Sequence, residues 1–470
     1  MAGTRTGTGT GTEPTGASAG DSLFGQPKGL FVLFMTEMWE RFSFYGMRAL
    51  LVLYMVQELL LPGHIENVAG MQGLRLFLEG QLGPMSTQAF ASQIFGLYAG
   101  MVYLTPIFGG WLADRFFGTR KVVLTGIALM TAGHFAMAFE WSVLIALTLL
   151  VLGSGCLKGN IAAQVGELYP KHDEAARAQG FTIFSTGINI GATLGPVACG
   201  LLAQVYGWHV GFTTAGALML VSGLVYVAGQ KHLAADRLPH HDREVAAPLS
   251  ADQWRMIFVI IIVIAIGIFP SLPYDQLANV GLIWIDEHVD LSTPFGDFPA
   301  AWFMALDPLA STLTVPFIIA YWRWQVRRDK GTDDLHKIAM ASLLFAISCG
   351  ILAVGDWFMQ QSGGRVAVWY PIVALSISGF SFMWYWPILL AFVSRHAPPQ
   401  VKAVMMAGVY LSSFVSGVGS GFVGRYYQPF GPMNFWLLNA GLGITGALCV
   451  LLFGPALRRW MARLEGRATT

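Results

Sequence analysis

Four charged residues lie inside one apolar segment near the start of the chain. The segment from Phe31 to Met55 is long enough to cross a bilayer, whose hydrocarbon core requires roughly 20 residues of helix. Its charged members are Glu37, Glu40, Arg41 and Arg48. Their spacing places all four on one face of an α-helix. Because ionisable groups inside a membrane usually face a partner or a wet cavity, we expect this face to line a polar site.

A fifth charge, Lys158, lies in the middle of another apolar segment. An unpaired ammonium group is expensive there, and the nearest plausible counterions on another helix are Glu37 and Glu40. We therefore expect an ion pair between two helices. If one carboxylate takes up a proton, the attraction is lost and Lys158 becomes available to another anion, which is proton coupling in outline. A static salt bridge that only orients the helices is the alternative.

The chain that carries these charges is strongly apolar. Of its 470 residues, 54% are hydrophobic and 12% are charged, and the mean hydropathy is +0.56. These values indicate a polytopic membrane protein. A net charge near +1 argues against a nucleic-acid surface, and the four cysteines lie far apart, without disulfide or metal-ligand spacing. We found no nucleophile, metal cluster or phosphate loop at diagnostic spacing, so we do not expect an enzyme.

Apolar segments of membrane-spanning length fall into two sets of six. We predict an all-α membrane protein with 12 transmembrane helices in two six-helix bundles, residues 27–229 and 254–455. A Gly- and Thr-rich tail, residues 1–26, is expected to be disordered and cytoplasmic. A polar linker, residues 230–253, joins the bundles, and a basic tail, residues 456–470, follows them. Two halves of six helices favour a secondary transporter with its site between them.

The basic residues predict the orientation. If the N-terminus is cytoplasmic, nineteen of the 28 Lys and Arg residues fall in cytoplasmic segments. Only Arg75, Arg365 and Arg425 fall outside, and the other six lie before the first span or within spans. This asymmetry follows the positive-inside rule. We therefore expect a multi-pass protein of the cytoplasmic (inner) membrane with both termini in the cytoplasm.

Several motifs resemble those of a known family. Residues 109–121, GGWLADRFFGTRK, resemble the cytoplasmic loop signature of the major facilitator superfamily. Residues 37–46, EMWERFSFYG, resemble the E-x-x-E-R-F-x-Y-Y-G signature of the proton-dependent oligopeptide transporter (POT) family, with Phe44 replacing one tyrosine. Residues 153–160 and 181–191 are similar to its fourth-span and fifth-span motifs, and Tyr274, Asp275, Gln276 and Asn279 to its seventh. The resemblance covers the first seven spans.

The resemblance implies a proton-coupled symporter that imports di- and tripeptides by alternating access. Its partners would be a small peptide or another small zwitterion, protons and the lipid bilayer, with protons as the coupling ion and no cofactor. The implied proton-linked groups are Glu37, Glu40, Lys158 and Asp275. Arg48 and Asp275 would also form a gate.

The resemblance further implies a pocket for a zwitterion. The residues matching the family's cationic pole for a peptide carboxylate are Arg41, Arg48 and Lys158. Tyr45 and Tyr103 match aromatic residues that line the cavity, although interfacial packing is an equal alternative for Tyr103. Asn189 is a further candidate for substrate binding, and an interhelical hydrogen bond is its alternative role.

Three positions depart from the family pattern. A glutamate that takes the peptide's amino terminus, five residues before a proline in the tenth span, is Phe382 here, and a fifth-span tyrosine is Ser185. The family's asparagine before a proline in the eighth span is Asp307. We hypothesise that the carboxylate for the amino terminus has moved from the tenth helix to the eighth.

Two rival interpretations remain open. Asp307 could be an additional proton site in a family member that carries a different small zwitterion or an organic anion. From another class, a membrane receptor that senses peptides without moving them would keep the binding site and need no proton coupling. No segment of the sequence resembles an appended signalling domain.

Overall fold

The computed structural model describes residues 22–170, 172–234, 248–294, 296–328 and 333–468. Within these ranges almost all regular structure is helical, because a helix satisfies its backbone hydrogen bonds internally in a lipid environment. Ten described helices are long and apolar enough to cross a membrane. Two others, α1 and α4, are less apolar but pack beside them, which gives the twelve helices of a major facilitator fold. The predicted fold class is therefore confirmed.

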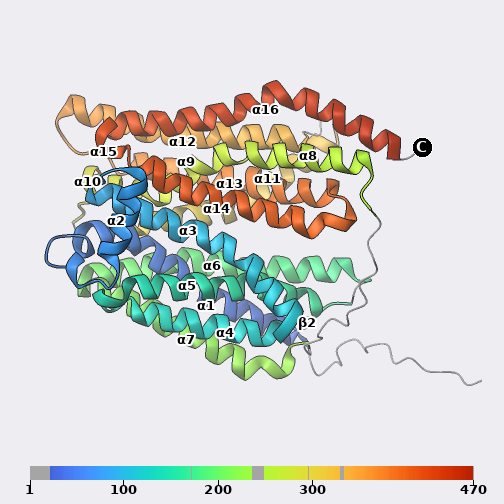
Figure 1. Cartoon of the computed structure of the whole chain (residues 1–470), viewed down its shortest axis with the longest axis horizontal. Coiled ribbons are helices and arrows are strands. Elements are labelled where there is room, and N and C mark those ends of the chain that lie inside the picture. The colour runs from blue at the N-terminus through green and yellow to red at the C-terminus, as the bar shows by residue number, and fades with distance from the viewer. Residues whose placement is uncertain (1–21, 171, 235–247, 295, 329–332, 469–470) are drawn as a thin grey trace, which may run out of the picture.

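The first half of the chain forms one group of helices (Figure 1). Its long helices are α1 (Lys28–Tyr54), α3 (Thr87–Leu112), α4 (Thr119–Ala136), α5 (Val143–Glu167), α6 (Glu174–Tyr206) and α7 (Trp208–Gly229). The helix α1 packs against α6 and α7, and α5 packs against α3 and α4. Two helices continue into π-helical turns, α1 into η2 (Met55–Leu59) and α3 into η4 (Ala113–Phe117).

The second half begins with an interrupted span. Its helices are α8 (Ala251–Ile266), α9 (Ile268–Ala278), α10 (Val280–His288), α11 (Leu306–Val326), α12 (Asp334–Ser362), α13 (Trp369–His396), α14 (Lys402–Gly424) and α16 (Pro432–Ala468). The seventh span, predicted as one apolar segment, is thus divided at Gly267 and Asn279. Two prolines in α9, Pro270 and Pro273, lack the N–H group that a continuous helix would use.

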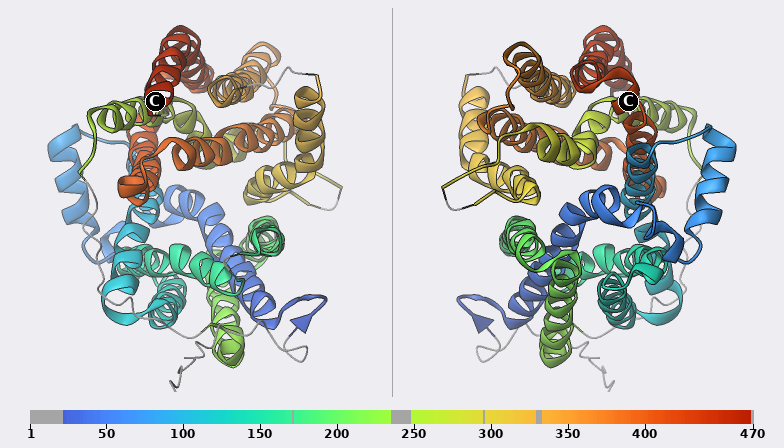
Figure 2. Two further views of the ribbon diagram at one scale, coloured as in Figure 1. Left: turned by 90° about the vertical axis from the view of Figure 1, so that its right-hand side faces the viewer. Right: turned by 90° about the vertical axis from the view of Figure 1, so that its left-hand side faces the viewer.

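Short elements occupy the ends of the bundles. They are β1 (Ser22–Leu23), β2 (Gln26–Pro27), η3 (Ile65–Asn67), α2 (Met71–Leu82), η5 (Glu140–Ser142), η6 (Gln230–His232), η7 (Ala300–Ala305), η8 (Pro399–Val401) and α15 (Tyr427–Phe430). We call the end where α1 begins and α16 stops the tail side, and the opposite end, which carries α2 and α15, the loop side (Figure 1). The views along the long axis show the helices of the two halves as separate groups (Figure 2).

Two terminal segments differ from their predictions. Residues 22–27 lie at the end of the tail that was expected to be disordered, but β1 and β2 pair there as a hairpin. Phe24 of this hairpin packs edge-on against Phe31, and Gln26 accepts a hydrogen bond from Tyr169, so local contacts order the segment. The rest of the tail, residues 1–21, lies outside the described residues. At the other terminus, the predicted basic tail is not a separate segment, because α16 continues through it to Ala468.

The two halves are joined on the loop side. Six hydrogen bonds between described residues cross the interface there, namely Gln57 to Asp286, Gln88 to Gly424, Asn279 to Ser92, Gln204 to Asp297, Trp302 to Val197 and Arg425 to Leu82. The helices α3 and α14 also meet through glycines. A Cβ atom on Gly96 would lie 2.6 Å from the carbonyl oxygen of Gly417. Small residues let two backbones approach this closely.

Large apolar side chains cover the outside of the helices. Phe317 on α11 and Leu452 on α16 are 75% and 72% exposed. Such exposure would be unfavourable in water but is expected for surfaces that contact lipid. The buried charges described below are therefore enclosed between helices, away from this apolar surface.

Candidate functional site

The central feature is the charged face of α1. Arg41 donates a hydrogen bond from Nε to Oε1 of Glu37 at 2.8 Å, and its Nη2 lies 2.7 Å from the same oxygen. Arg41 Nε is also 3.1 Å from Oε2 of Glu40. Both carboxylates are at most 1% exposed. The helical spacing of one turn, predicted from the sequence, thus brings two buried acids to one guanidinium.

These two acids are incompletely paired. Oε2 of Glu37 and both oxygens of Glu40 are buried and lack a hydrogen-bond partner among the described residues. Two ionised carboxylates beside one guanidinium leave one negative charge without a contacting counterion. Buried charge of this kind is unfavourable unless a proton or another cation neutralises it. The arrangement is therefore suited to binding a proton.

Lys158 lies on α5, facing the same region. Its Nζ is 4.5 Å from the ring centroid of Phe44 and 5.1 Å from that of Tyr103. Within the described part of the chain, no carboxylate oxygen lies within 4 Å of this ammonium group, although Glu40 is within electrostatic range. The expected ion pair of Lys158 with Glu37 or Glu40 is thus not formed in this structure. Arg41 takes that place because it lies one turn from Glu37 and beside Glu40 on the same helix.

A second charged pair connects the two halves. Arg48 Nη2 on α1 lies 4.0 Å from Oδ1 of Asp275 on α9. Asp275 also accepts a hydrogen bond of 2.7 Å from the hydroxyl of Ser416 on α14. The guanidinium of Arg48 stacks over the Phe95 ring at 5.5 Å. The pair is therefore held by side chains from two further helices, α3 and α14, and Ser416 was not identified from the sequence.

The second half contributes one acid and an aromatic wall. Asp307, at the start of α11, accepts a hydrogen bond of 3.4 Å from Ser311, one turn further along the same helix. Asp307 and Arg48 are both within electrostatic range of Tyr45. Asp307 therefore faces the charged helix α1 from the opposite half.

The aromatic wall is centred on Phe382. Its ring stacks on Tyr274 at 5.3 Å and on Trp386 at 6.5 Å. Trp386 also contacts Tyr103 at 6.2 Å and Tyr410 at 5.8 Å. An apolar ring thus occupies the position of the family's glutamate. It contacts Trp386, which contacts Tyr103, and Tyr103 lies against Lys158. The sequence identified the missing acid but not the stack that replaces it.

Two further candidate residues, Tyr45 and Asn189, make fewer contacts within the site. Tyr45 packs edge-on against Phe44 at 5.2 Å, next to the Lys158 contact. Asn189 lies on α6 and is half-buried, and its side chain makes no hydrogen bond to the described residues. Gly191, two residues further along, packs directly against α1, since its Cβ would lie 2.2 Å from the carbonyl oxygen of Met38. Asn189 is therefore on a helix that contacts the site, without a direct bond into it.

A separate cavity lies on the loop side between the halves. It measures about 640 Å³, and its polar lining includes Gln57, Gln204, Asp286, Asp297 and Arg365. None of the candidate site residues lines it. The cavity therefore belongs to the contact region that joins the halves on the loop side.

Comparisons with known proteins support this architecture. The profile of the Major Facilitator Superfamily matches residues 33–416. The uncharacterized transporter YclF of Bacillus subtilis (strain 168) is 33% identical over 93% of this chain and 75% of its own length. A di-/tripeptide transporter of Lactococcus lactis subsp. cremoris is 26% identical over 93% of this chain and 97% of its own length.

Solved structures give the same result. A crystal structure of a point mutant of the peptide transporter POT in complex with sulfate superimposes with a TM-score of 0.81 at 26% identity and covers 93% of this chain and 96% of that one. The same mutant in complex with alafosfalin also has a TM-score of 0.81 at 26% identity, covering 94% and 97%. The protein is therefore a multi-pass membrane transporter, not an enzyme, and it belongs to the Major Facilitator Superfamily and, within it, to the POT family.

Proposed function

We propose that this protein is a symporter that imports di- and tripeptides with protons across the cytoplasmic membrane. The observation that carries the proposal is the group of Glu37, Glu40, Arg41 and Lys158, which faces Asp307 from the other half. The peptide transporters among its relatives support the substrate class. The tail side would be cytoplasmic, as the distribution of basic residues predicts.

The proton step follows from the charge balance. With Glu37 and Glu40 ionised, Arg41 and Lys158 balance their charge, but only Arg41 is in contact with them. A peptide carboxylate that binds Lys158 leaves Arg41 as the single cation for two acids. Protonation of Glu40, whose oxygens have no hydrogen-bond partner among the described residues, would restore the balance. Substrate and proton would therefore bind together.

The substrate would span the two halves. Lys158, with Arg41 and Arg48 nearby, provides the positive side, and Asp307 provides the negative side for an ammonium group. Tyr45 and Tyr103 would contact the peptide between these poles, and Asn189 would offer a polar contact from α6. The wall of Tyr274, Phe382 and Trp386 would favour an apolar side chain.

Alternating access would be a relative movement of the bundles, residues 27–229 and 254–455, which the linker 230–253 connects. The loop side is joined by six hydrogen bonds, so we infer that the structure represents a state closed on that side. Arg48 and Asp275, at 4.0 Å, would form the gate, with Asp275 as a second proton-linked group. Breaking this pair would accompany opening of the loop side.

The test is uptake of labelled dialanine into proteoliposomes with and without an inward proton gradient. We expect accumulation with the gradient, and its loss in Glu40→Gln, whereas exchange of external for preloaded peptide persists because it requires no net proton movement. Glu174→Gln, an exposed acid at the start of α6, is the matched control. Equal accumulation in Glu40→Gln and the unmodified protein would refute the assigned proton site.

A second candidate substrate class has its own support. Phe382 stands where the family places an acid, and it lies half-buried in an aromatic stack that offers no negative charge to an ammonium group. Another small zwitterion or an organic anion would suit such a pocket. Competition against dialanine uptake by free peptides, N-acetylated peptides and amino acids separates the two classes. Inhibition by amino acids or by acetylated peptides, but not by free peptides, would favour the second.

A further inference from the structure

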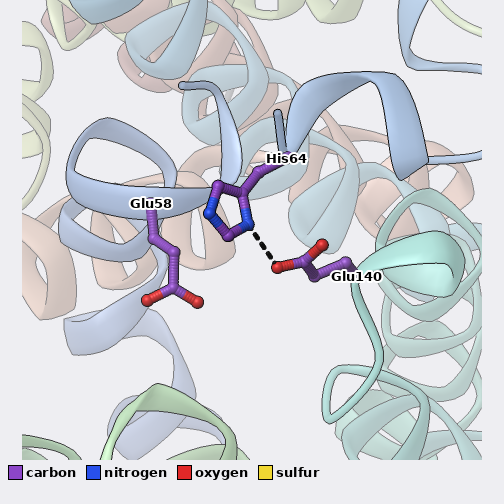
Figure 3. A group of neighbouring side chains, drawn as sticks. All are labelled: Glu58, His64 and Glu140. Atoms are coloured by element: carbon purple, nitrogen blue, oxygen red, sulfur yellow. Dashed lines mark hydrogen bonds and ion pairs between the residues drawn. The ribbon is translucent and has the colours of Figure 1, made fainter. Parts of the chain in front are cut away.

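A cluster of metal-binding side chains lies on the loop side, within the first half and away from the central site (Figure 3). Glu58 comes from η2, His64 from the segment before η3, and Glu140 from η5. One ligand atom from each residue lies within 4.8 Å of the other two. The three segments are not contiguous in sequence, so the fold brings these side chains together.

The imidazole of His64 is already oriented. Its Nδ1 lies 2.6 Å from Oε1 of Glu140, and the other oxygen of Glu140 accepts a hydrogen bond of 3.3 Å from Asn67. This contact holds the ring nitrogen and the carboxylate side by side, so a metal ion that replaces the shared proton would have both groups as ligands. Figure 3 shows the ring beside the carboxylate of Glu58 as well.

A second histidine approaches from α7. Nε2 of His209 lies 3.7 Å from Oε1 of Glu58. Its other nitrogen, Nδ1, is buried and has no hydrogen-bond partner among the described residues. The cluster therefore combines two imidazoles with two carboxylates, and it is not simply a group of surface acids.

We propose that Glu58, His64 and Glu140, together with His209, form a binding site for Zn²⁺ or a similar transition-metal ion. Mixed imidazole and carboxylate ligands suit Zn²⁺, whereas Mg²⁺ and Ca²⁺ prefer oxygen ligands alone. Neighbouring donors in a tetrahedral zinc site are about 3.3 Å apart, so the more distant donors must approach, whereas His64 and Glu140, at 2.6 Å, must move slightly apart. The four side chains are 22% to 43% exposed and lie at helix ends, where such movement is possible.

Binding would connect four segments of the first half. It would also fix η2, whose Gln57 donates a hydrogen bond of 2.5 Å to Asp286 of the other half. The metal would thus stabilise the loop side of the protein. This inference does not depend on what the transporter carries, because none of its residues belongs to the central site.

The first experiment is titration of Zn²⁺ into the purified, tag-free protein by calorimetry, with Mg²⁺ as the comparison ion. We expect one Zn²⁺ per chain, and affinity reduced about 10- to 100-fold in His64→Gln and in Glu58→Gln. The matched control is His336→Gln, which alters a histidine–carboxylate pair with Asp333 on the tail side and should leave the affinity unchanged. Substitution by Co²⁺ should give the visible absorption of tetrahedral coordination.

Thermal unfolding provides the second measurement. Zn²⁺ should raise the melting temperature of the unmodified protein and of His336→Gln, but not of His64→Gln. If His64→Gln fails to fold, His209→Gln serves instead. Unchanged Zn²⁺ affinity in both His64→Gln and Glu58→Gln, or an equal response to Mg²⁺, would overturn the proposal.

The site also predicts how binding depends on pH. Two of the four proposed ligands, His64 and His209, are imidazoles, which bind a metal only through a deprotonated nitrogen. A proton competes with the metal for the imidazole. Zn²⁺ affinity should therefore fall as the pH is lowered through the range in which imidazoles take up a proton. An affinity independent of pH across this range would contradict a histidine ligand.

Discussion

Arg41, and not Lys158, contacts the two acids of α1. At the residue scale, Arg41 holds both acids of α1, whereas Lys158 lies over the rings of Phe44 and Tyr103. A cation over an aromatic face gains about 0.5 to 2 kcal/mol, whereas removing one partner of a buried ion pair costs about 3 to 5 kcal/mol. A substrate carboxylate can therefore displace Lys158 from these rings without breaking an ion pair.

The role of Asp307 gives a prediction at this scale. We expect Asp307→Asn to weaken competition by peptides with a free amino terminus by about 10- to 100-fold, because a hydrogen bond to a charged group contributes about 1.5 to 3 kcal/mol. N-acetylated peptides should be unaffected. The measurement is inhibition of labelled dialanine uptake in proteoliposomes, with Asp252→Asn as a control on the tail side.

A second substitution tests whether the acid has changed helices. Phe382→Glu, combined with Asp307→Asn, should recover recognition of a free amino terminus at least in part, because it restores one negative charge on α13. If the double variant is no better than Asp307→Asn alone, and both fold, the carboxylate has not simply moved between helices. Size-exclusion profiles of the purified variants provide the folding control.

Some residues of the site could be predicted and others could not. The face carrying Glu37, Glu40 and Arg41 follows from helical periodicity, which depends only on sequence spacing. The hydrogen-bond donor to Asp275 is Ser416, one of many serines in the chain. Sequence spacing does not single it out, because it reaches Asp275 only through the packing of α9 against α14. The expected pairing of Lys158 failed because an arginine on the same helix was closer to the acids.

At the scale of elements, the broken seventh span is the main departure from prediction. The segment reads as one apolar helix, but the chain turns at Asn279, with φ −94° and ψ −93°, between α9 and α10. Hydropathy determines that a segment crosses the membrane but not where it bends. The break lies next to Asp275 and Gln276, so the backbone changes direction close to the proposed gate.

The glycine contact between α3 and α14 gives a prediction for these elements. A Cβ atom on Gly417 would lie 2.6 Å from the backbone nitrogen of Gly100. Gly417→Leu should therefore separate the two helices, lower the melting temperature, cost about 1 to 3 kcal/mol and abolish most uptake. The control is Gly441→Leu on α16, where a Cβ meets no atom within 4 Å. Normal uptake by Gly417→Leu would show that transport does not require the close contact between α3 and α14.

At the scale of the whole molecule, the halves must separate on the loop side for substrate to enter. The hydrogen bond between Gln57 and Asp286 lies across this interface at 2.5 Å. In a protein lacking its four native cysteines, a thiol cross-link between Gln57→Cys and Asp286→Cys should stop uptake reversibly. A cross-link between Gln26→Cys and Gln179→Cys, both in the first half, should not. Persistent uptake by the first cross-linked protein would exclude opening at this position.

The charge balance of the α1 cluster has a consequence for the energy source. With Glu37 and Glu40 ionised, Arg41 and Lys158 balance the α1 cluster and Arg48 balances Asp275, so an ionised Asp307 leaves the empty site with one negative charge. A bound zwitterion and one proton add a single positive charge. The loaded site is then neutral, and the membrane voltage would act on the empty return, which carries the negative charge outward. One charge moved through 100 mV corresponds to about 2.3 kcal/mol, enough for a roughly 50-fold accumulation of peptide even without a pH difference.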